Sequence, residues 1–88
     1  MARRIKAEAV RQRLIDGGHE FSEFDGGEWD PGFRTVQAGP RQVNVFYDGP
    51  GEEEQLQALS AELRAAGLHV HASQLDGGGR RRLEVSRP

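Results

Sequence analysis

Two histidines and a run of three arginines near the carboxyl end are the residues whose types and spacing suggest chemistry. His69 and His71 are two positions apart, and Arg80, Arg81 and Arg82 follow a few residues later. On a β-strand, residues i and i+2 point to the same face, so both histidines can reach one metal ion. Consecutive arginines suggest contacts with phosphates or carboxylates. The alternative is that both groups are the solvated side of a β-hairpin.

A metal site would need more ligands than this histidine pair provides. Zinc takes three or four protein ligands, and the chain contains no cysteine to supply them or to form disulfides. His19 and Asp76 are ligands by residue type, but their spacing does not bring them to the pair. We therefore expect two solvated histidines, no metal and no cofactor.

Motifs of known catalytic chemistry are absent from the sequence. The stretch from Asp76 to Arg80 lacks the lysine of a phosphate-binding loop, and its three glycines suit a hairpin turn. Asp25, Glu28 and Asp30 are carboxylates in a glycine-rich segment, where such groups are usually solvated. We therefore expect a protein that is not an enzyme.

The composition indicates one small domain with a thin core. Of 88 residues, 35% are hydrophobic and 30% are charged, and the net charge is −2. This length fits a single domain over residues 1–88, in which the few aromatic residues carry much of the burial. Trp29 is therefore expected to be a lid on the core rather than an exposed anchor. No stretch has the ~18 apolar residues of a membrane helix, nor the pattern of a signal peptide, so we expect a soluble, cytoplasmic protein.

Two amphipathic helices are predicted, over about residues 3–18 and 52–66. Each has apolar residues at i, i+3 and i+7, and each is followed by glycine. The second also begins with three glutamates, where the helix dipole favours negative charge. The apolar stripes consist of Ala7, Val10 and Leu14 in the first helix and of Leu56, Leu59 and Leu63 in the second.

The remaining segments predict strands. Residues 19–24 alternate only loosely, residues 33–47 divide into two strands at 38–40, and residues 68–75 and 81–86 form a hairpin. Two helices can cover only one face of such a sheet. We therefore expect an α+β fold, a two-layer sandwich in which two helices pack on one face of an antiparallel sheet of four or five strands. The expected order is α-β-β-β-α-β-β.

Alternation along the strands separates a core face from an open face. The expected core contains Val43, Val45, Tyr47, Leu68, Val70, Leu83 and Val85 from the sheet, packed against Val10, Leu14, Leu56, Leu59 and Leu63. The open face is expected to carry Asn44, Phe46, His69, His71, Arg82 and Glu84, with Arg34 as a further member.

The chain also contains an internal similarity between "RLIDGGHEF" and "ELRAAGLHV". Both run from a helix end through glycine to a strand start, matching Gly18 with Gly67 and Phe21 with Val70. An Asp-Gly-Gly turn follows each, at Asp25 and at Asp76. The similarity indicates either an αββ pseudo-repeat or the common physics of helix capping.

The predicted order α-β-β-β-α, over roughly the first three quarters of the chain, resembles that of double-stranded-RNA-binding domains and of HicA-type mRNA-interfering toxins. This resemblance implies RNA as a ligand. The RNA-binding family places lysines at the start of the second helix, where this chain has Glu52, Glu53 and Glu54. The toxins place a catalytic histidine in a Gly-Ser/Thr-His triplet, whereas here Gly18 directly precedes His19. These departures count against carrying over either activity.

Two kinds of partner therefore compete for the open face and the arginine-rich hairpin. A partly apolar face with an edge strand suits a protein partner or a second copy. Phe46 among arginines suits RNA or DNA, whose bases stack on aromatic rings. Because 14 acidic residues exceed 12 basic ones, we expect a binding or regulatory module for protein, with nucleic acid as the alternative. The expected binding residues are Phe46, His69, His71, Arg80, Arg81 and Arg82.

Overall fold

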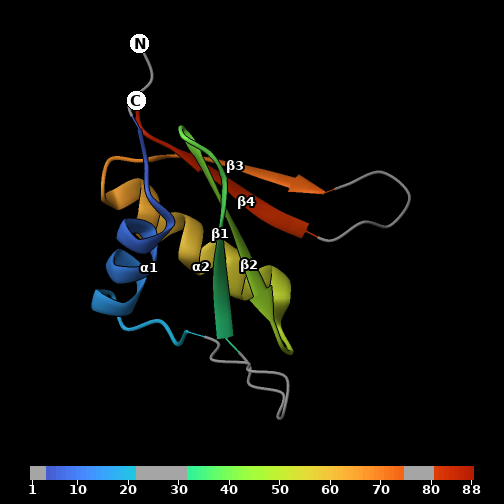
Figure 1. Ribbon diagram of the computed structural model, residues 1–88. Helices are drawn as coiled ribbons and strands as arrows, with labels where there is room; N and C mark the ends of the chain where they lie inside the picture. Colours follow the sequence, from blue (N-terminus) through green and yellow to red (C-terminus); the bar gives the residue numbers. More distant parts are fainter. Residues whose placement is uncertain (1–3, 22–31, 75–80) are drawn as a thin grey trace, which may run out of the picture.

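The computed structural model describes residues 4–21, 32–74 and 81–88, which fold into two layers (Figure 1). Helices α1 (Ala7–Asp16) and α2 (Glu52–Ala65) pack on one face of an antiparallel sheet. The described strands are β1 (Gly32–Gly39), β2 (Gln42–Asp48), β3 (His69–Gln74) and β4 (Arg81–Ser86), in the sheet order β1-β2-β4-β3. The predicted two-layer α+β fold is therefore confirmed.

The described residues contain one strand fewer than the sequence predicts. Phe21, expected in the first strand, forms only an isolated parallel bridge with Phe33. Its ring packs edge-on against Phe33 at 5.3 Å between centroids, and the Arg11 guanidinium lies 4.4 Å from its centre. These side-chain contacts hold Phe21 beside β1 without a ladder of backbone bonds.

The described order is α-β-β-α-β-β. Among the described residues, two strands separate the helices, instead of the three found in double-stranded-RNA-binding domains and HicA-type toxins. Trp29 and the Asp-Gly-Gly stretches at Asp25 and Asp76 lie outside the described residues.

The core lies between the helices and the inner face of the sheet. Nine of the residues predicted for it are buried: Val10, Leu14, Val43, Val45, Leu56, Leu59, Leu63, Leu83 and Val85. Tyr47, Leu68 and Val70 are partly buried at its border. The core also includes Phe33 and Ile5, which the apolar patterns did not place there. Ile5 precedes α1 and is only 2% exposed, so a residue outside both helical stripes completes the core.

The chain consists of two halves with the same order of elements, α1-β1-β2 and α2-β3-β4. The strands β2 and β4 meet at the centre of the sheet, and β1 and β3 form its two edges. Two residues after its last helical residue, each helix is followed by a glycine in the left-handed region, with φ of 90° at Gly18 and 86° at Gly67. The following amides then donate to the last helical turn, from His19 to Leu14 O and from Leu68 to Leu63 O, at 3.0 and 3.1 Å. The arrangement is that of an αββ pseudo-repeat.

A two-fold relation connects the halves at the centre of the sheet. Asn44 lies opposite Glu84, and a half-turn about this pair exchanges Val43 with Leu83. The counterpart of β3 is consequently β1, which begins at Gly32, and the sequence match of Phe21 with Val70 was wrong. The first half has a long connection from helix to strand, whereas residues 66–68 suffice in the second.

We expect the substitution Ile5→Ala to destabilise the fold by about 2–4 kcal/mol, because it removes a buried side chain from a small core. Urea unfolding followed by circular dichroism measures the loss. Val36→Ala is the matched control, since Val36 is 47% exposed, and it should change the free energy of unfolding by less than ~0.5 kcal/mol. Equal effects of both substitutions would contradict the burial of Ile5.

We expect Gly67→Ala to cost about 1–2 kcal/mol, because residues with a Cβ disfavour the left-handed conformation. Gly39→Ala is the control: Gly39 does not have a positive φ, and an added Cβ would meet nothing within 4 Å. Thermal unfolding of both variants makes the comparison. A melting temperature lowered equally in the two would argue against the glycine cap.

Candidate functional site

The open face is the side of the sheet turned away from the helices. Opposed residues of antiparallel strands point to the same side, so the register identifies its members. Arg34 is opposite Phe46, Asn44 is opposite Glu84, and Glu84 is opposite His71. The open face therefore comprises Arg34, Val36, Asn44, Phe46, Asp48, His69, His71, Ser73, Arg82, Glu84 and Ser86. Every residue predicted for this face lies on it.

The apolar part of the open face is small and lies over β1 and β2. Phe46 is half-buried and has Arg34 opposite it on β1. The exposed fraction of Val36 is 47%, and among the described residues Val36 is the large hydrophobic residue that is exposed. Val36 and Phe46 together give this face an apolar area bordered by charged side chains.

The arginines of the open face are neutralised by carboxylates of the same face. Arg34 Nε lies 2.5 Å from Asp48 Oδ2, and Arg82 Nη2 lies 3.4 Å from Glu84 Oε2. Both members of the second pair are about three-quarters buried, with side-chain exposures of 22% and 23%. Each of these two guanidinium groups is therefore paired with a carboxylate, and the positive charges of the face are balanced by negative ones.

The two histidines share the open face with Phe46 and Arg82. His69 and His71 are both exposed, with Ser86 and Glu84 as their partners on β4. Within the described residues, His, Cys, Asp and Glu side chains form no group of three or more that could hold a metal ion.

The three consecutive arginines do not form one surface. Arg82 is on the open face, whereas Arg81 is on the helix side, where its Nη1 lies 3.3 Å from Glu53 Oε2. Neighbouring residues of a strand point to opposite faces, so this separation is a direct result of the β conformation. Arg80 lies outside the described residues.

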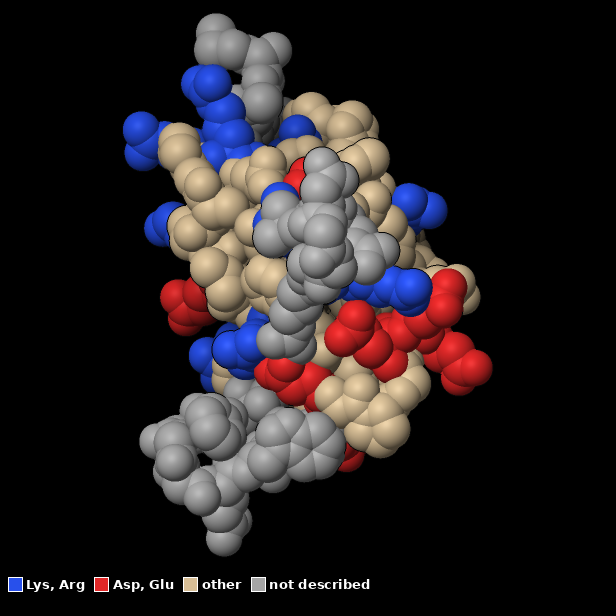
Figure 2. Space-filling model, turned by 90° about the vertical axis from the view of Figure 1, so that its right-hand side faces the viewer, with Lys and Arg blue, Asp and Glu red and all other residues tan. Residues whose placement is uncertain are grey.

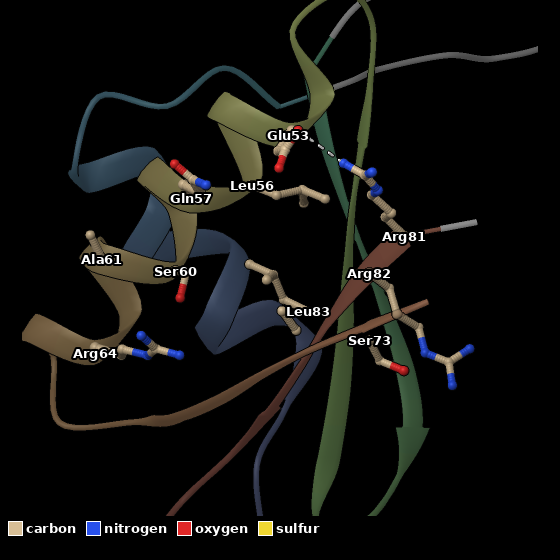
Figure 3. A pocket seen from close by; sticks show the side chains of 11 residues that line it. Glu53, Leu56, Gln57, Ser60, Ala61, Arg64, Ser73, Arg81, Arg82 and Leu83 are labelled. Atoms are coloured by element: carbon tan, nitrogen blue, oxygen red, sulfur yellow. Dashed lines mark ion pairs between the residues drawn. The ribbon is translucent and has the colours of Figure 1, made fainter. Parts of the chain in front are cut away.

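A groove on the helix side was not anticipated from the sequence. It lies between α2 and the β3–β4 hairpin, with a volume of about 540 Å³ (Figure 3). Its apolar part is formed by Leu56, Ala61, Ala72 and Leu83, and its polar part by Glu53, Gln57, Ser60, Arg64 and Arg81. We call this surface the α2–hairpin groove. Arg82 borders it, but its guanidinium points away in Figure 3.

The groove exists because the β3–β4 hairpin extends beyond the cover of α2. Ala72 faces the helix side, as alternation predicts, and is nevertheless exposed. One wall is bounded by Arg64, whose Nη2 donates to Val70 O at 3.0 Å. The ion pair between Arg81 and Glu53 crosses the other end (Figure 3). In the sequence, the sign of this groove is that two residues of its lining, Ala61 and Ala72, are alanines. Larger side chains at these positions would occupy its space.

Figure 2 shows the molecule from the side, with acidic and basic side chains of the described residues in adjacent areas.

Comparison with protein-family models, curated proteins and solved structures finds no match to this chain. In the part of the chain that the structure describes, neither helix is long and apolar enough to cross a membrane.

We expect zinc or nickel ions to leave the melting temperature unchanged, because two exposed histidines without a third ligand do not make a stable site. Thermal unfolding with added metal, against an EDTA control, measures this. The variant with His69→Ala and His71→Ala should behave in the same way. A melting temperature that rises with metal in the unsubstituted protein, and not in this variant, would show that the pair binds metal.

Proposed function

We propose that this chain is a small non-enzymatic protein-binding module, and that its open sheet face associates with a second copy of the chain. The observation that carries the proposal is the composition of the face. It presents Phe46 and the exposed Val36 beside arginines already paired with carboxylates. Such a mixture of apolar area and balanced charge suits another protein surface.

The ion pairs favour protein over nucleic acid as the partner. Binding to a polyanion depends on Lys and Arg side chains that neutralise phosphates and release counterions. Here Arg34, Arg81 and Arg82 each lie within 4 Å of a carboxylate of the same chain. Phosphates would have to compete with Asp48, Glu53 and Glu84 for these guanidinium groups.

A second copy suits the face because its charges are self-complementary. Two such faces can meet with arginine opposite carboxylate and without net repulsion. The face is four strands wide and about six residues long, or roughly 19 by 20 Å from standard strand spacings. That size is below a standard interface, so we expect a weak dimer that forms with rising concentration.

We expect Val36→Glu to abolish self-association, because it places an uncompensated charge in the apolar part of the interface. Sedimentation velocity over about 5 to 500 µM should show a concentration-dependent dimer for the unsubstituted chain and a monomer for the variant. Ala58→Glu is the matched control, since Ala58 is exposed on α2, in the other layer. It should leave the dimer intact.

The proposal fails if the unsubstituted chain remains monomeric over this range, or if Ala58→Glu weakens the dimer as much as Val36→Glu. A labelled single-stranded RNA provides the opposing measurement. If its affinity for the chain falls steeply with salt and is lost in Phe46→Ala, the open face is a nucleic-acid surface instead.

A further inference from the structure

The two-fold relation between the halves gives the α2–hairpin groove a counterpart in the first half. Gln37 lies opposite Val43, and Ala72 lies opposite Leu83. Because the half-turn exchanges Val43 with Leu83, it also exchanges Gln37 with Ala72. The place beside Gln37, between β1 and α1, therefore corresponds to the groove beside Ala72.

In the first half, an extended piece of the chain fills this place. The backbone of Ile5 donates to Pro40 O at 3.0 Å, and Gln37 Nε2 donates to Ile5 O at 2.7 Å. Ala7 N donates to Gln37 Oε1 at 2.8 Å, and Lys6 between them is extended, with φ −111° and ψ 138°. The Ile5 side chain is 2% exposed. An extended segment thus buries one aliphatic side chain against the sheet and α1.

In the second half, the chain takes a different path. It enters α2 from β2 through residues 49–51, so no described segment runs beside Ala72 as residues 4–6 run beside Gln37. The strand β3 is also an edge of the sheet. In this strand, Val70 O accepts a hydrogen bond from Arg64 Nη2 of α2.

The strand β3 has little that opposes pairing with an added strand. Natural edge strands are often protected by lysine, proline or inward-pointing charges. The sequence of β3, His-Val-His-Ala-Ser-Gln, contains none of these. By contrast, β1 is accompanied at its edge by Ile5 near one end and by Glu20, whose carbonyl accepts from Phe33 N at 2.9 Å, near the other.

We propose that the α2–hairpin groove binds an extended acidic peptide segment from a partner protein. One aliphatic side chain of the peptide packs against Leu56 and Leu83, in the place that corresponds to that of Ile5 in the first half, and a neighbouring carboxylate meets Arg64. Within the described residues, Arg64 makes no ion pair, and its hydrogen bond goes to a backbone carbonyl. Extended peptides commonly bind at sheet edges in this way, with pockets for alternate side chains.

The charge of the groove determines which kind of peptide suits it. Arg64 lies at one end of the groove without an ion pair to a described residue, whereas Arg81 at the other end is paired with Glu53. The amino-terminal segment of a second copy would bring Arg4 and Lys6 close to Arg64, and like charges make it a poor occupant. A segment of the same shape with acidic residues in those places has the complementary charge.

The test uses a synthetic peptide built on the segment that fills the first half. The probe has the sequence of residues 3–8 with each Arg and Lys replaced by Glu, and both ends blocked. Titration of the ¹⁵N-labelled full chain, followed by NMR, should give saturable shifts at Leu56, Ser60, Arg64, Ala72 and Leu83. Affinities of about 0.1–1 mM are expected for so short a peptide.

Two variants of the protein and one of the peptide make the assignment specific. Arg64→Glu should weaken binding at least about tenfold through charge reversal, and Ala72→Trp should do so by filling the groove. Ala58→Glu, on α2 but outside the groove lining, is the control and should bind normally. The peptide with the unreplaced basic residues should also bind at least about tenfold more weakly.

The proposal is overturned if the acidic peptide causes no saturable shifts at about 5 mM, or if the shifts fall on the open face. It is also overturned if Arg64→Glu and Ala72→Trp both leave the affinity unchanged. All titrations are repeated in the Val36→Glu background. The groove is thus tested separately from the open face, and failure of one surface does not decide the other.

Discussion

The contact between β2 and β4 is the interaction on which the rest of the structure depends. It joins two αββ halves, and it places Val43, Val45, Leu83 and Val85 side by side under the helices. A helix with a single hairpin offers too little apolar area to be stable alone. Pairing two such units produces one continuous sheet whose inner face both helices can cover. The core, the open face and both edges all follow from this central contact.

The two halves differ at the edges of the sheet. A segment of the chain covers the edge of β1, whereas a groove lies beside the edge of β3. The edge of β1 is occupied by the chain itself, through Ile5 and Glu20. The edge of β3 carries the Arg64 side chain, and the groove beside it holds polar groups of both charges. The first half therefore uses its edge to complete the core, whereas the edge of β3 borders the groove where we propose that a partner peptide binds.

The sequence predicted the features that depend on local periodicity. The spacing of leucines identified α2, and alternation placed Phe46, His69, His71 and Arg82 on one face. It missed features set by tertiary contacts. Ile5 lies outside any repeating pattern, and the groove depends on how far the hairpin extends beyond α2. Grouping Arg81 with Arg82 followed their proximity in sequence and overlooked the alternation that separates them.

The two-fold at the Asn44–Glu84 pair also has a consequence for how such a fold can be assembled. Each half contributes one central strand in the same relation to the other. The same relation would hold between two identical αββ subunits that shared one sheet in a symmetric homodimer. When both halves belong to one polypeptide, the sequence of one half can change while the other stays the same. That independence allows one edge to be closed and the other to remain open, which two identical subunits cannot do.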